Sequence, residues 1–236
     1  MNTFLISLLI SILFSLFCGD FIKKNNKKLY IISVILAIIT GYLGYNAKEL
    51  GITKGSPLSN FLVYFTKGFI PTAIFIIVMF TGALNNKLKI TQKLLRIRGE
   101  LSIIASILMF SHGGLYLLRF FKNSLPRMLS GEEMPLKIYV INFSGIIALL
   151  IMIPLFITSF IMIRKKMKAN TWKKLQKYSY IFYFLTYIHI VFCTSKKFGI
   201  DYPKLSLYTF IFLMYTIMRI YKYRNRQVKK LSTSIA

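Results

Sequence analysis

The stretch GELSIIASILMFSHGGLYLLRFF, residues 99–121, decides the fold, because it is long and apolar enough to cross a bilayer. A second stretch, KYSYIFYFLTYIHIVFC at 177–193, has the same character, and each stretch carries one of the chain's two histidines. Apolar segments of this kind can be drawn at roughly 3–18, 29–45, 68–84, 100–121, 138–163, 178–194 and 205–221. The sequence therefore predicts an all-α, polytopic membrane helix bundle with six to seven transmembrane helices.

Composition supports a membrane protein. Of the 236 residues, 56% are hydrophobic, and the mean hydropathy is +0.60, more than the core of a soluble domain of this length needs. The formal net charge is +26, which in a soluble protein would suggest nucleic acid. Here the basic residues cluster between apolar segments, a distribution typical of membrane topology. We therefore expect the lipid bilayer, and no nucleic acid, as a partner.

Basic loops set the predicted orientation, since cytoplasmic loops carry an excess of Lys and Arg. Rich clusters lie at 23–28, 87–98, 164–177 and 219–230, and the loops between them are poorer in bases and hold Glu49, Glu132, Glu133 and Asp201. The first segment could be a signal peptide, but its lack of an initial charge and of a small-residue cleavage site favours a retained helix. We predict a multi-pass plasma-membrane protein with its N-terminus outside and its C-terminus in the cytoplasm.

Three regions are predicted along the chain. Residues 1–66 hold one or two membrane helices and an external loop, 67–222 a helical core, and 223–236 a basic cytoplasmic tail. No glycine-rich nucleotide fingerprint is present, so a nicotinamide would have to be oxidised by a partner. All six acidic residues are expected in loops or at helix ends, which argues against ion-driven transport.

The two histidines, His112 and His189, are predicted at matched depth. His112 comes 14 residues after Arg98 and His189 comes 12 residues after Lys177, offsets that place both roughly 20 Å from the cytoplasmic boundary at the helical rise. A neutral imidazole is a good haem ligand, so the pair indicates one axially ligated haem iron. The alternative is a buried, hydrogen-bonded histidine with no ligand.

Neighbouring residues extend the predicted site. Gly113 would let a flat porphyrin approach the helix, although close helix packing explains it equally well. Arg119 and Lys196 each follow a histidine by one heptad, where they could meet haem propionates or act as ordinary interfacial anchors.

Three motifs resemble the ferric reductase-like transmembrane family, which includes MsrQ-type and STEAP-like haem b membrane proteins. They are TGAL at 81–84, KLLRIRGELSIIASILMFSHGGLYL at 93–117 and WKKLQKYSYIFYFLTYIH at 172–189. The resemblance implies a ferric reductase-like core that binds haem b through one axial histidine from each of two helices, matched by His112 and His189. Two-haem members carry a further histidine inward on each helix. Arg98 and Gln176 stand there, so we predict a single bis-His haem in the outer leaflet.

The predicted function is electron transfer through that haem. Electrons would come from a separate cytoplasmic flavoprotein or from quinol, and an extracytoplasmic redox partner would accept them. A flavin, FMN or FAD, could meet its phosphates at Arg98, or a quinone could occupy the inner half. The alternative is a cofactor-free small-solute permease or a membrane assembly subunit, in which Pro71 and Pro154 would mark broken helices.

Overall fold

The protein's structure is a computed structural model that describes residues 2–196 and 199–235. It confirms the all-α class. The long helices are α1 (Asn2–Phe17), α3 (Asn26–Tyr45), α5 (Phe69–Ala83), α6 (Lys89–Arg119), α8 (Leu136–Ile157), α11 (Tyr178–Thr194) and α12 (Tyr202–Ile235). Short elements join them: α2 (Gly19–Lys24), α4 (Pro57–Thr66), the π-helical turn η1 (Phe120–Ser124), α7 (Leu125–Leu129), α9 (Ile161–Lys166) and α10 (Ala169–Gln176). A minimal antiparallel pair, β1 (Ser195–Lys196) with β2 (Gly199–Ile200), precedes α12.

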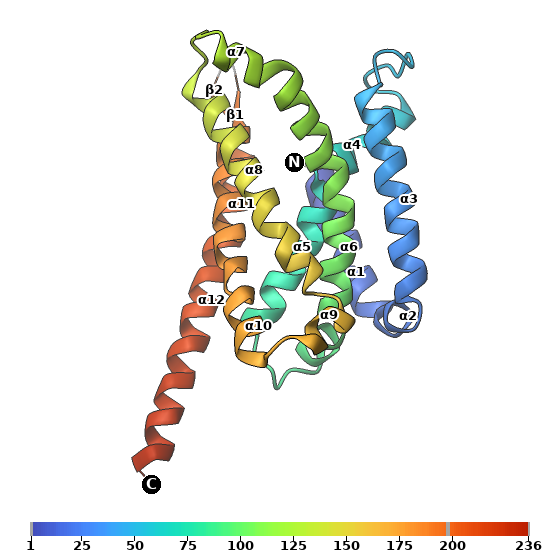
Figure 1. The fold of residues 1–236 in the computed structure, drawn as a ribbon. Helices are drawn as coiled ribbons and strands as arrows, with labels where there is room; N and C mark the ends of the chain where they lie inside the picture. Colours follow the sequence, from blue (N-terminus) through green and yellow to red (C-terminus); the bar gives the residue numbers. More distant parts are fainter. Residues whose placement is uncertain (1, 197–198, 236) are drawn as a thin grey trace.

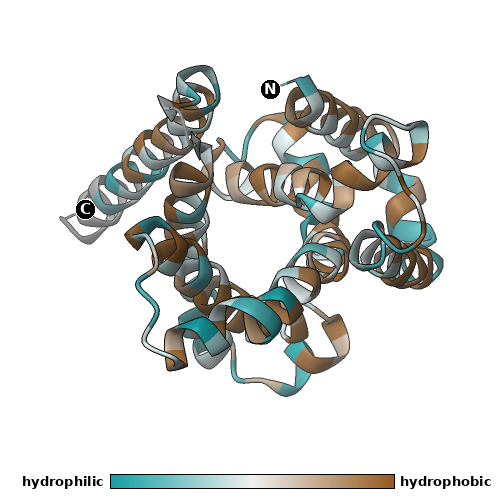
Figure 2. Cartoon of the chain, turned by 90° about the horizontal axis from the view of Figure 1, so that it is seen from above, coloured by the Kyte–Doolittle hydropathy of each residue, from teal (hydrophilic) through white to brown (hydrophobic). Residues whose placement is uncertain are grey.

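Among the described residues, four helical spans are long and apolar enough to cross a membrane: Asn26–Tyr45, Pro57–Ala83, Lys89–Leu129 and Leu136–Ile157. Hydrophobic residues lie on outward-facing as well as inward-facing turns of the helices (Figure 2); on α3, for example, Ile38 is 65% exposed. Such a surface suits hydrocarbon rather than water. The protein is therefore a membrane protein, while the count of six to seven crossings stays a prediction.

Five helices form a ring in the order α5, α6, α8, α11 and α12, each packing on the next and α12 closing on α5. Helix α1 packs outside α5, and α3 packs outside α6 (Figure 1). Buried serines on α1, namely Ser7, Ser11 and Ser15, are small enough for close approach between membrane helices. Helices α6 and α11, which carry the two histidines, are thus not neighbours in the ring but face each other across it.

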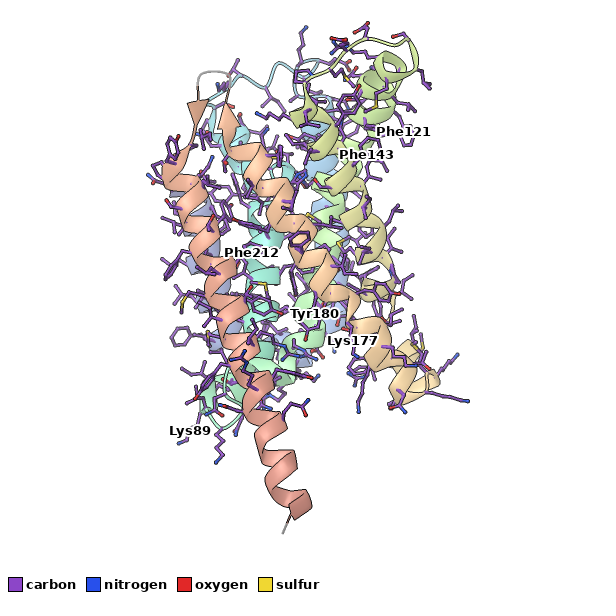
Figure 3. The ribbon with its side chains drawn as sticks, turned by 90° about the vertical axis from the view of Figure 1, so that its left-hand side faces the viewer. Lys89, Phe121, Phe143, Lys177, Tyr180 and Phe212 are labelled. Atoms are coloured by element: carbon purple, nitrogen blue, oxygen red, sulfur yellow. The ribbon has the colours of Figure 1, made fainter. Side chains whose placement is uncertain are left out.

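The ends of the bundle differ in charge. Lys89 and Lys177 lie at one end, and Phe121 and Phe143 lie at the other (Figure 3). Elements α2, α9 and α10 and the end of α12 gather at the lysine-bearing end (Figure 1). The basic loops predicted on one side of the membrane therefore do share one end of the molecule.

Helix α4 was not expected. The part of residues 1–66 that follows the apolar segment 29–45 is predicted as an external loop, but α4 occupies its second half. Ser56 caps this helix by accepting a hydrogen bond from the Ser59 N–H at 3.2 Å, and Pro57 occupies the first turn, a combination that favours helix starts. Its own side chains Leu62 and Phe65 are buried against the bundle.

Glu100 requires a correction. It is expected at a helix end, yet it lies within α6, where it is 3% exposed and paired with Lys23 of α2. A second ion pair joins Asp20 to Arg96 of α6. Because a carboxylate in an apolar setting needs a partner, Glu100 fixes the α1–α3 segment to the core. Its charge is neutralised by Lys23, which is why this buried acid does not by itself indicate a transport path.

Helix α8 ends earlier than the predicted segment 138–163. Thr158 and Ser159 turn their hydroxyl groups back to the carbonyls of Pro154 and Leu155, at 2.7 and 2.8 Å, which satisfies acceptors at the helix end. The helix runs unbroken through Pro154, and Pro71 lies in the first turns of α5. Pro154 therefore does not break its helix, whereas Pro71 follows the interruption between α4 and α5 at residues 67–68, and the permease alternative stays a prediction.

Candidate functional site

The two histidines meet across the ring. His112 comes from the half of α6 away from the lysine-bearing end and His189 from the corresponding half of α11, the outer half in the predicted orientation. Their ring centroids are 6.2 Å apart with an interplanar angle of 87°. Metal–nitrogen bonds of about 2 Å on opposite faces of a planar cofactor put two axial imidazole centroids about 6 Å apart. The separation therefore matches that of an axial ligand pair.

Each imidazole is oriented by a backbone carbonyl. His112 Nδ1 lies 2.9 Å from the Thr66 carbonyl at the end of α4, and His189 Nδ1 lies 3.0 Å from the Ile141 carbonyl on α8. A carbonyl can only accept, so each Nδ1 carries the proton and each Nε2 keeps its lone pair. Metal-bound histidines are held in this way. Within the described residues neither Nε2 has a hydrogen-bond partner, so both remain able to bind a metal.

A glycine lies against each ring. A Cβ built on Gly68 would lie 3.2 Å from His112 Cγ, and one built on Gly145 would lie 3.1 Å from His189 Cε1. Gly68 also has a φ of +69°, which permits the sharp passage from α4 to α5. Because neither glycine has a side chain, each leaves the space that the neighbouring imidazole occupies. The sequence analysis missed both glycines; a small residue within an apolar segment, as Gly145 is, was the signal that could have found one of them.

Gly113, by contrast, meets a side chain of α8. A Cβ there would lie 3.0 Å from Leu149 Cδ1, so its small size serves the packing of α6 on α8. Nothing lies within 4 Å of the equivalent position on Gly114. A role of Gly113 toward a porphyrin stays a prediction.

Cations gather on the outer side of His112. The Tyr116 ring lies 4.7 Å from the His112 ring. Lys67 donates to the Tyr116 hydroxyl at 3.0 Å, and the Arg119 guanidinium lies 5.4 Å from the centre of that ring. Arg119 is thus near the site, as expected, and Lys67 is an unforeseen companion. The side chain of Lys196 lies outside the described residues.

Apolar groups fill the next level inward. One heptad before His112 and His189 stand Ala105 and Phe182, both buried in one cluster with Phe75. The rings of Phe75 and Phe182 pack edge to face at 5.1 Å. Neither Ala105 nor Phe182 can ligate a metal, so these two positions offer no second ligand pair.

The two positions that replace the inner histidines lie at the basic end. Gln176 donates to the Thr158 hydroxyl at 3.4 Å. Arg98 is half-buried, and its Nη1 atom would lie 4.0 Å from a Cβ built on Gly82. Both lie on the far side of the apolar level from the histidine pair, so they do not belong to the same site.

Comparisons with known proteins identify the family. The family model described as "Ferric reductase like transmembrane component" matches residues 67–187; His112 lies inside the match and His189 just beyond it. An uncharacterized protein of Treponema pallidum (strain Nichols) is 32% identical over 181 residues, which cover 73% of this chain and 48% of that protein. The chain thus spans about half the length of this relative. No solved structure matches. With its helical membrane bundle and these similarities, the chain belongs to the ferric reductase-like transmembrane family.

Proposed function

We propose that the protein is a membrane electron-transfer component that binds one haem b between His112 and His189. The observation that carries the proposal is the pair of imidazoles 6.2 Å apart whose Nδ1 atoms are both held by carbonyls. Haem is the planar cofactor that two such nitrogens, supplied from opposite sides, fit best. When bound, it would supply reversible one-electron chemistry at iron.

The protein's own groups prepare the site. The carbonyls of Thr66 and Ile141 fix the tautomer and the direction of each ring, which strengthens a histidine as a ligand. Phe75 and Phe182 exclude water from the inner side, and a dry surrounding controls the redox potential of such a centre. Arg119 and Lys196 would meet the propionates at the outer end. Arg98 and Gln176, at the positions of the inner histidines of two-haem members, are not usual haem ligands, which supports a single haem.

The proposed direction of transfer is supported by the basic loops that gather at one end of the bundle, because such loops favour the cytoplasmic side. We place the basic end in the cytoplasm, with the N-terminus outside and the C-terminus inside, so the histidine pair lies nearer the outer surface. Electrons would enter from a separate cytoplasmic flavoprotein, whose FMN or FAD could approach the bases around Arg98, or from a membrane quinol. They would leave to an extracytoplasmic redox partner.

Absorption spectroscopy of the purified protein tests the haem. Wild-type protein expressed with excess haem should show the spectrum of six-coordinate low-spin haem b, with one haem per chain in a pyridine haemochrome assay. His112→Ala and His189→Ala should each abolish that band, because one axial ligand is lost. Tyr116→Phe is the matched control: it alters a ring beside His112 but removes no ligand, and should keep the band. A wild-type protein that stays colourless would disprove the proposal.

A further inference from the structure

A groove separates α11 from α12 in the inner half of the bundle. Its volume is about 500 Å³, within the roughly 300–1,000 Å³ of small-molecule sites. Figure 3 shows the two helices side by side, with Phe212 near mid-height and Tyr180 closer to the basic end. Aromatic and apolar side chains make most of the lining, among them Tyr183, Phe184, Tyr187, Phe212, Leu213 and Tyr215.

The groove opens toward the bilayer. Phe184 and Leu213, which line it from opposite helices, are 61% and 54% exposed, so a molecule dissolved in the hydrocarbon can reach it without crossing water. At the basic end the Arg219 guanidinium lines the groove and bonds to the Tyr180 hydroxyl at 2.8 Å and to the Gly82 carbonyl at 2.8 Å. The ligand that enters here is therefore a lipid-soluble one.

A polar pair lies in the upper part of this apolar groove. Tyr187 and Thr209 are hydrogen-bonded to each other through their hydroxyl groups at 3.0 Å. Two hydroxyls carry two protons, and their mutual bond uses one. No described residue accepts the other proton, and a donor without an acceptor at membrane depth is costly. The unused proton indicates a ligand with an oxygen atom at this level.

Depth distinguishes the ligand from a phospholipid. Tyr187 lies nine residues into α11, roughly 13 Å from its basic end at the helical rise. A phospholipid keeps its polar oxygens at the interface, whereas a quinol carries hydroxyl oxygens on a flat ring that can lie deep in the bilayer. An aromatic ring also suits the aromatic lining.

We propose that the groove between α11 and α12 binds a membrane hydroquinone, with one ring oxygen at the Tyr187–Thr209 pair, and that this is where electrons enter. This inference rests on the proposed function for the role of the ligand, but not for its binding. It selects quinol over a flavoprotein as the donor. Helix α11 lies between the groove and the histidine pair, because His189 leaves that helix toward Ile141 of α8.

The reaction balances as follows. Oxidation of a hydroquinone to a quinone breaks two O–H bonds and releases two electrons and two protons. The electrons cross α11, about 10–12 Å, one in each of two cycles, and each leaves to the external one-electron acceptor before the next arrives. The protons leave to water at the basic end of the groove, which Tyr180 and Arg219 line.

Reduction by a soluble hydroquinone tests the site in full-length protein in nanodiscs. Duroquinol should reduce the haem of the wild type, as followed by the ferrous absorption band. Thr209→Val removes one hydroxyl with little change in shape and should slow this reduction about tenfold, the effect of losing one hydrogen bond of roughly 1.4 kcal/mol. Thr209→Trp fills the groove and should prevent it. Dithionite, which needs no site, should reduce every variant equally.

Ile217→Trp is the matched control, since Ile217 is on α12, is 53% exposed and does not line the groove. It should leave duroquinol reduction unchanged. A photoreactive azidoquinone gives a readout that needs no haem: it should label α11 and α12 in the wild type and fail to do so in Thr209→Trp. Labelling of other helices, or duroquinol reduction of Thr209→Trp at the wild-type rate, would overturn the groove. Labelling of α11 and α12 in a protein that binds no haem would uphold the groove and disprove the haem proposal.

Discussion

The outer and inner levels of α6 and α11, one heptad apart, differ in the side chains that they present to the centre of the bundle. At the outer level α6 and α11 present His112 and His189, each oriented by a backbone carbonyl. One heptad inward the same faces present Ala105 and Phe182, buried in an apolar cluster. Both levels are central to the bundle, but at these matched positions only the outer one presents metal-ligating side chains.

This difference implies that haem binding depends on the outer level and the free energy of unfolding on the inner level. The outer level depends on hydrogen bonds from outside the two helices, namely from the end of α4 and from α8. The inner level depends on shape, since Phe75 and Phe182 pack edge to face. Substitutions at the outer level should therefore change haem binding, and substitutions at the inner level should change the free energy of unfolding.

The largest expected effect on haem binding is at Gly68. Gly68→Val adds a side chain 3.2 Å from His112 Cγ at a φ of +69°, so it both displaces the imidazole and strains the backbone, the latter by about 1–3 kcal/mol. Haem affinity should fall about 10–100-fold, as for other groups that orient a metal ligand. Haem titration of the apoprotein measures it.

Gly51→Val is the control for backbone strain alone. Gly51 has a φ of +62°, and nothing lies within 4 Å of its Cβ position. Gly51→Val should lower the stability of the protein as Gly68→Val does, but its haem affinity should equal that of the wild type. Equal haem affinities in the two variants would show that the His112 contact is unimportant.

The second prediction concerns the inner level. Phe182→Ala should lower the free energy of unfolding by about 3–5 kcal/mol, because it leaves a cavity beside Phe75, while the haem spectrum of the folded protein stays unchanged. Chemical unfolding in detergent measures the first and absorption the second. Phe210→Ala, at a lipid-facing position that is 62% exposed, should cost far less. Loss of haem from the folded Phe182→Ala variant would contradict the expectation that inner-level substitutions leave haem binding unchanged.

The smallest effect is expected at Gly145. Gly145→Ala places a methyl group 3.1 Å from His189 Cε1 within a regular helix, so the ring must shift and its 3.0 Å bond to Ile141 must lengthen. A loss of up to about tenfold in haem affinity follows. Gly114→Ala, where nothing lies within 4 Å, should bind haem as the wild type does. A wild-type affinity for Gly145→Ala would show that the His189 ring tolerates displacement.

Much of the fold was predictable because a bilayer restricts the choice. Apolar length identifies a membrane helix with little dependence on the rest of the chain, and the bounds of α1, α5 and α11 lie within a residue or so of the predicted segments. Helix α4 was missed because its polar flanks resemble a loop. Glu100 was misplaced because hydropathy alone begins the segment there, whereas α6 starts at Lys89.

The sequence by itself determined the class of the protein and its two ligand candidates, since two histidines in hydrocarbon are rare and their depth follows from helical rise. Tertiary structure alone decided how they are held. The carbonyls of Thr66 and Ile141 lie 46 and 48 residues away from the histidines that they orient, and every residue carries a carbonyl, so no sequence pattern marks them. Only the packing of α4 and α8 selects these two.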